Sequence, residues 1–83
     1  LRIKGDSMAE AIQPGDLVLV ERGQTASRGE IVVALLEDEA TCKRFFPDKN
    51  RVYLRSDNPR YDDIVVSNDF KLLGKVKALV RKY

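Results

Sequence analysis

Apolar and polar residues alternate over short stretches of this chain, and only one short stretch indicates a helical turn. Alternation predicts a strand with one buried face, whereas a short continuous apolar run predicts a strand buried on both faces. Residues 51–55 follow the first pattern and residues 17–21 follow the second. The sequence therefore predicts seven short strands, at 1–4, 17–21, 30–36, 39–46, 51–55, 64–66 and 70–83.

The segments between these strands carry turn signals. Glu37-Asp38 separates two strand patterns by two residues, which predicts a hairpin. Residues 7–12 form the one stretch with a helical pattern, and Ser7 and Glu10 have the S-x-x-E spacing of a capping box. We therefore expect an all-β fold: a small, twisted, partly open, barrel-like sheet with one short helical turn at Ser7. No linker divides the chain, so residues 1–83 are expected to form a single domain.

Composition narrows the chemistry that this chain can perform. It has 83 residues, no histidine and one cysteine, which excludes a Ser-His-Asp triad and a Cys-His pair and argues against a protein zinc site. We expect no metal and no cofactor. Cys42 has no partner for an internal disulfide, which predicts a reducing, cytoplasmic location. A net charge of +2 gives no strong footprint for nucleic acid, and no apolar run is long enough to cross a membrane.

Without histidine, a nucleophilic serine needs another base, and lysine is the natural candidate. Ser7 and Lys43 are the residues we single out, although a helix cap and a solvated strand lysine are the simpler interpretations. Strand alternation places Lys43 on the same face as Thr41 and Phe45. A lysine base must be neutral, so its pKa must fall from about 10.4 towards 7 or 8, which requires burial.

Five ordered blocks of the sequence resemble the LexA/UmuD/phage-repressor peptidase family. The resemblance covers nearly the whole chain. The blocks are Gly5-Asp6-Ser7-Met8, Pro14-Gly15-Asp16-Leu17-Val18-Leu19-Val20, Gly29-Glu30-Ile31-Val32-Val33-Ala34, Glu39-Ala40-Thr41-Cys42-Lys43-Arg44, and Asp57-Asn58-Pro59-Arg60-Tyr61 with Ile64 and the closing Gly74-Lys75-Val76.

This resemblance implies a role for several residues and partners. Ser7 would be the nucleophile, Lys43 the general base and later the acid, and the backbone N–H groups of Asp6 and Ser7 the oxyanion hole. The bond cut would be an Ala-Gly bond upstream in the repressor's own chain, and a RecA filament on single-stranded DNA would promote the cut. An absent N-terminal domain would bind operator DNA, the cut would end repression of DNA-damage genes, and the strand between Lys75 and Val80 would form a homodimer.

The sequence also departs from the family pattern. It contains no Ala-Gly dipeptide and begins at Leu1, so we expect a piece of a longer protein that lacks its own cleavage segment. The stretch from Met8 to Gly15 is about one residue short and is similar in length to that of type I signal peptidases. Cys42 stands where the family pattern has valine, and we expect it to pack in the core. Two alternatives therefore stay open: a signal peptidase-like fragment, and a catalytically idle dimerisation module.

Overall fold

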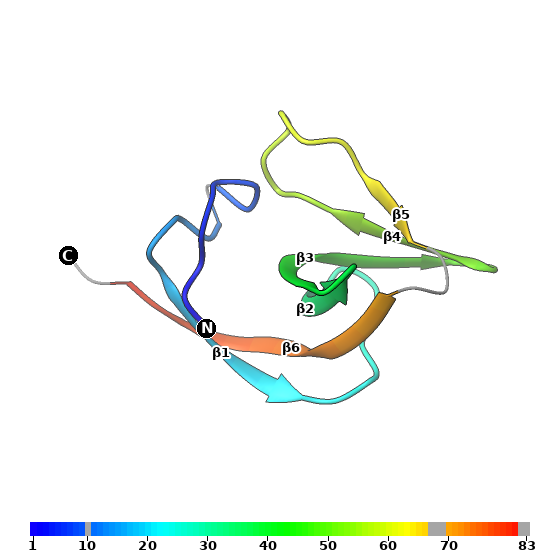
Figure 1. Cartoon of the computed structure of the whole chain (residues 1–83), viewed down its shortest axis with the longest axis horizontal. Coiled ribbons are helices and arrows are strands. Elements are labelled where there is room, and N and C mark those ends of the chain that lie inside the picture. Colours follow the sequence, from blue (N-terminus) through cyan, green and yellow to red (C-terminus); the bar gives the residue numbers. More distant parts are fainter. Residues whose placement is uncertain (10, 67–69, 82–83) are drawn as a thin grey trace.

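The computed structural model describes residues 1–9, 11–66 and 70–81. The described residues form one antiparallel sheet in the order β1-β6-β2-β3-β4-β5 (Figure 1). The strands are β1 Leu17–Arg22, β2 Ile31–Leu36, β3 Glu39–Asp48, β4 Arg51–Arg55, β5 Ile64–Val66 and β6 Phe70–Val80. The sheet is open, with β1 and β5 at its edges, and this confirms the expected all-β, partly open scaffold.

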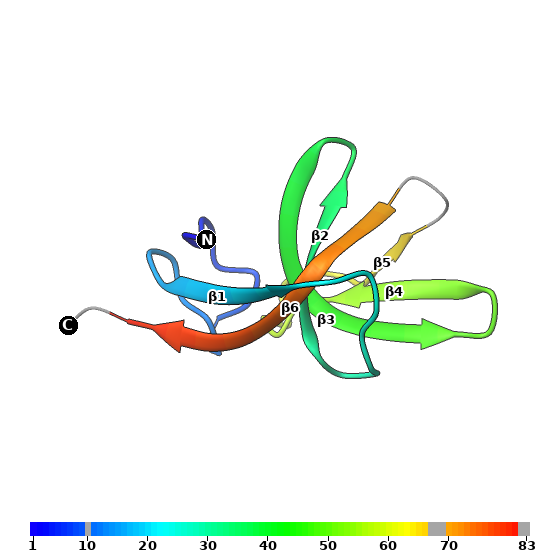
Figure 2. The same ribbon diagram turned by 90° about the horizontal axis from the view of Figure 1, so that it is seen from below.

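The predicted hairpin between β2 and β3 is present, with its turn at Glu37 and Asp38. Both residues have positive φ, 46° and 70°, as expected for a tight two-residue turn whose twist matches that of the flanking strands. The β2–β3 and β3–β4 hairpins point in different directions in Figure 2, so the sheet is strongly twisted. β3 belongs to both hairpins: its first half pairs with β2, and its second half pairs with β4.

Two expectations about the N-terminal part of the sheet are wrong. Residues 1–4 form no strand: they adjoin the start of β1 through the bridge between Arg2 and Leu17 and through backbone hydrogen bonds of Leu1 and Ile3 with residues 15–18, and the chain turns at Gly5, whose φ is 75°. The described residues therefore contain six strands rather than seven. β1 is not buried on both faces: Val18 is 2% exposed, but Leu17 is 43% and Leu19 60% exposed. β1 is an edge strand, and only one of its faces is covered.

The sequence predicted a helical turn at residues 7–12, and the described residues there form hydrogen-bonded turns but no helix. Ala9 N–H donates to the Asp6 carbonyl (3.0 Å) and Ile12 N–H donates to the Met8 carbonyl (2.8 Å). Glu10 lies outside the described residues, so the structure does not test the predicted capping box.

The buried side chains form two clusters, and the first cluster positions the N-terminal segment, the described residues before β1 (1–9 and 11–16). Residues of the N-terminal segment pack there against β1 and β3; the cluster comprises Ile3, Met8, Ile12, Val18 and Cys42. The second cluster lies among β2, β4, β5 and β6 and comprises Val32, Ala34, Leu54, Val66 and Leu72. Because Met8 is 2% exposed, the turn that carries its neighbour Ser7 is held against the sheet beside β3.

Candidate active site

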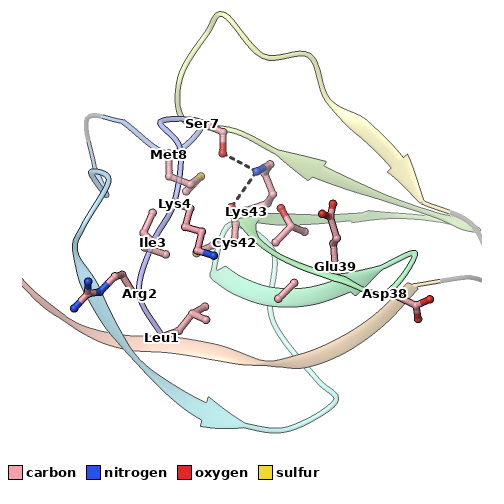
Figure 3. Close-up of a pocket in the computed structure, with 12 residues that line it drawn as sticks. Leu1, Arg2, Ile3, Lys4, Ser7, Met8, Asp38, Glu39, Cys42 and Lys43 are labelled. Carbon is pink, nitrogen blue, oxygen red and sulfur yellow. Dashed lines mark hydrogen bonds between the residues drawn. The ribbon is translucent and has the colours of Figure 1, made fainter.

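The side chains of Ser7 and Lys43 are in direct contact. Lys43 Nζ lies 2.7 Å from Ser7 Oγ in a hydrogen bond, and it donates a second, longer bond of 3.3 Å to the Cys42 carbonyl (Figure 3). Ser7 comes from the turn after Gly5, and Lys43 comes from β3. The structure therefore brings together the two side chains that the sequence singled out, at a distance suited to proton transfer.

Lys43 is a buried lysine with no carboxylate beside its amine in any described contact. Its residue is 8% exposed, and burial lowers the pKa of its ammonium below the ordinary value of 10.5. Removal from water disfavours the charged form, and the nearby Cys42 thiol opposes this effect only in part. The burial that the sequence argument required of a lysine base is present, and it favours the neutral amine.

A cavity of about 500 Å³ lies beside this pair, between the N-terminal segment and the start of β3 (Figure 3). Ser7, Met8 and Lys43 line it together with residues 1–4 and 38–42. Its volume falls within the range of pockets that hold small ligands or short peptide segments. β4 pairs with β3 only from Arg44 onwards, so no described strand pairs with residues 39–43 on the side away from β2.

The 57–61 loop, which links β4 to β5, contacts the Ser7 turn. Asn58 N–H donates to the Ser7 carbonyl (2.9 Å), and Asn58 Nδ2 donates to the Asp6 carbonyl (3.0 Å). Tyr61 donates its hydroxyl hydrogen to Asp6 Oδ1, and Arg44 forms a bidentate salt bridge with Asp57. Sequence reasoning missed these contacts, because the S-D-N-P pattern signals only a turn.

The two expected oxyanion-hole donors lie in the same turn. Among the described residues, none accepts a hydrogen bond from the backbone N–H of Asp6 or Ser7.

Cys42 is 9% exposed and belongs to the first core cluster, in agreement with the packing role expected for it. Burial is the main reason why the pKa of its thiol rises to about 11.

The described parts of the chain contain no group of three or more residues that could hold a metal ion. They also contain no helix that is long and apolar enough to span a membrane.

Comparison with known proteins gives a consistent family assignment. The family model described as Peptidase S24-like matches residues 1–77. The chain is 55% identical to a LexA repressor of Desulforamulus reducens, over 99% of this chain and 38% of that protein. It is 47% identical to LexA repressors of Caldicellulosiruptor saccharolyticus and Geotalea uraniireducens, over 99% and 98% of this chain and 41% and 42% of theirs. The chain thus spans about two fifths of the length of these relatives.

Proposed function

This chain belongs to the peptidase S24-like family, and we propose that residues 1–83 form the C-terminal peptidase and dimerisation domain of a LexA-like transcriptional repressor. The observation that carries the proposal is the 2.7 Å contact between Ser7 Oγ and the buried Lys43 Nζ, in a chain whose relatives are LexA repressors. The cavity beside this contact supplies room for a segment of peptide.

In the proposed mechanism, neutral Lys43 takes the proton of the Ser7 hydroxyl while Ser7 Oγ attacks the alanine carbonyl carbon of an Ala-Gly bond. The backbone N–H groups of Asp6 and Ser7 stabilise the negative oxygen of the tetrahedral intermediate. Lys43 then returns the proton to the glycine amine, which leaves. Water hydrolyses the ester on Ser7, again with Lys43 as the base, and the free serine is restored.

The proposed substrate is a segment of the repressor's own chain, upstream of the serine. A RecA filament on single-stranded DNA would act as the co-protease, and the cut would end repression in the SOS response to DNA damage. Because this chain spans about two fifths of its LexA relatives, operator binding is assigned to another part of the protein. The unpaired thiol of Cys42 supports a cytoplasmic location.

The proposed homodimer uses the C-terminal half of β6, between Lys75 and Val80. β2 pairs with β6 only as far as Lys75, so the following residues of β6 pair with β1 on one side and with no described strand on the other. Leu79 and Val80 there are 39% and 53% exposed. An open strand edge with exposed apolar side chains is suited to pairing with a second copy.

The relatives named above are repressors, which favours this proposal over a type I signal peptidase-like fragment. The remaining alternative is a dimerisation module in which the Ser7–Lys43 pair is idle. That alternative predicts the same fold and the same dimer without peptide cleavage, so only an activity measurement separates the two.

The test supplies the substrate on a separate chain. A full-length LexA-type repressor, with its own nucleophilic serine changed to alanine, is mixed with this domain at pH 7 and at about pH 10, where an ordinary lysine is substantially neutral. We expect a single cut at the Ala-Gly bond, and we expect Ser7→Ala and Lys43→Ala to abolish it. A folded domain that makes no cut at either pH would establish the idle module.

A further inference from the structure

Asn58 contacts both carbonyl groups that flank the Ser7 side chain along the backbone. Its side-chain Nδ2 donates to the Asp6 carbonyl (3.0 Å), and its backbone N–H donates to the Ser7 carbonyl (2.9 Å). Ser7 and Asn58 are 51 positions apart in the numbering, so this contact is made entirely by the tertiary fold. No step of the proposed mechanism uses Asn58.

The geometry of the peptide bond gives this contact a consequence. The Asp6 carbonyl and the Ser7 N–H belong to one planar trans peptide unit, and in such a unit the C=O and N–H bonds point in opposite directions. Ala9 N–H donates to the same Asp6 carbonyl (3.0 Å). With the carbonyl held from two sides, the Ser7 N–H points away from the 57–61 loop, and no described residue accepts it.

Asn58 is itself held in one orientation. Its Oδ1 accepts the backbone N–H of Arg60 (3.0 Å), and its carbonyl accepts the N–H of Tyr61 (3.1 Å). With Oδ1 engaged in this way, Nδ2 is the atom that faces Asp6.

The 57–61 loop contacts β3, the strand that carries Lys43, through a salt bridge. Arg44 Nε and Nη2 lie 3.0 and 3.2 Å from the two carboxylate oxygens of Asp57, and Arg44 Nη1 donates to the Gly29 carbonyl (3.0 Å). Bidentate pairs of this kind fix orientation as well as distance. Because Arg44 follows Lys43 directly in β3, one network links the strand of the lysine to the turn of the serine.

We propose that Asn58 is a positioning residue that orients the peptide unit between Asp6 and Ser7, so that the Ser7 N–H faces the developing oxyanion. The inference rests on the proposed function for its catalytic consequence. The orientation of the peptide unit itself is a property of the fold and can be measured separately.

Two variants test the role of the side chain. Asn58→Ala removes the bond to the Asp6 carbonyl. Asn58→Ser also removes it but keeps a side-chain oxygen able to accept the N–H of Arg60, so the loop retains its turn. Tyr61→Phe is the matched control, because it removes the neighbouring bond to the Asp6 carboxylate and leaves the peptide unit held by Asn58.

The first readout is cleavage of the serine-deficient repressor over a range of pH. Loss of one oxyanion donor costs about 10²- to 10³-fold in kcat, so a loosened donor should cost about 10-fold or more. We expect this loss of kcat in both Asn58 variants, with KM and the pH midpoint unchanged because substrate docking and Lys43 are untouched. Tyr61→Phe should keep kcat to within about twofold.

The second readout is the order of the Ser7 amide by ¹⁵N relaxation, which needs no activity. We expect a rigid amide, with an order parameter of about 0.85, in the wild type and in Tyr61→Phe, and a lower value in both Asn58 variants. An unchanged Ser7 amide in both Asn58 variants, or kcat values that stay near wild type, overturns the inference. If the wild-type domain cuts no repressor at all, the proposed function fails, and the order of the Ser7 amide alone decides the role of Asn58.

Discussion

Lys43 Nζ and Ser7 Oγ lie 2.7 Å apart although 36 positions separate the two residues along the chain. Ser7 sits in a turn that belongs to no strand, whereas Lys43 sits in the middle of the sheet. The contact exists because apolar side chains of the N-terminal segment, Ile3 and Met8 among them, pack in the same cluster as Cys42, next to the lysine. The geometry of this pair and the stability of the fold therefore depend on the same packing.

The pH dependence of cleavage should follow the amine of Lys43. Burial lowers the pKa of this amine below 10.5, so the neutral, basic form becomes populated at a lower pH than in an exposed lysine. We expect kcat to rise with pH through the lowered pKa and to level off below pH 10.5, as measured from cleavage rates at pH 6 to 10. Lys43→Arg should be inactive at every pH in this range, because a guanidinium stays protonated. A rate that does not vary with pH would contradict this role.

The same burial should make the stability of the domain depend on pH. The folded state has the lower lysine pKa, so between that pKa and 10.5 the unfolded chain binds more protons and stability rises with pH. Each unit of pKa difference corresponds to about 1.4 kcal/mol. We therefore expect Lys43→Met to gain most stability relative to wild type at low pH. This difference in the free energy of unfolding should decrease as the pH approaches 10.5. Urea unfolding at several pH values measures this difference, with Lys71→Met, on the surface of β6, as the control for loss of a lysine.

Cys42 should be unreactive in the folded domain. With its thiol pKa raised to about 11, only about one thousandth of the thiol is ionised at pH 8, and the thiolate is the reactive form. Iodoacetamide labelling followed by mass spectrometry should be slow in the native protein and fast after unfolding in guanidinium chloride. Cys42→Val, which should fold with a similar core, is the unlabelled control. Rapid labelling of the native domain would show that the thiol is accessible.

Gly74→Ala should destabilise the sheet. A Cβ at this position would overlap the backbone oxygen of Glu21 and lie 2.6 Å from Val20 Cγ1, and the backbone of β1 cannot move aside without breaking its pairing with β6. Overpacking of this kind costs about 1–3 kcal/mol, seen as a lower urea midpoint. Gly23→Ala is the matched control, since a Cβ added at Gly23 would have no other atom within 4 Å. Equal midpoints for the two variants would show that β1 and β6 do not approach as closely as described.

The dimer should depend on the exposed C-terminal end of β6. Val80→Glu replaces an exposed apolar side chain of the proposed contact by a charged one, and removing that charge from water on pairing is unfavourable. We expect this variant to sediment as a monomer at concentrations where the wild type is a dimer. Val65→Glu is the matched control, because Val65 on β5 is 55% exposed and Val80 is 53% exposed, and the two residues lie in different parts of the sheet. Dissociation by Val65→Glu alone would move the interface to β5.

The sequence predicted those features of the fold that depend on neighbouring residues. Strand alternation is set by residues two apart, and the hairpin at Glu37-Asp38 is set by a two-residue turn, so both could be identified without long-range contacts. The absence of histidine pointed to lysine as the base for a nucleophilic serine, and the requirement that Lys43 be buried followed from its ordinary pKa. None of these inferences needed the position of one strand relative to another.

Only the tertiary structure decided which faces are covered and which distant residues meet. Leu17 and Leu19 look like core residues in sequence, but they lie on the uncovered face of β1, opposite to the buried Val18, and are therefore exposed. The burial of Lys43 and its 2.7 Å contact with Ser7 arise from the packing of the N-terminal segment on β3, and the contacts of Asn58 arise from the fold of a loop that is distant from Ser7 in the chain. Burial and long-range contact depend on residues that are far apart in the chain, so no local pattern contains them.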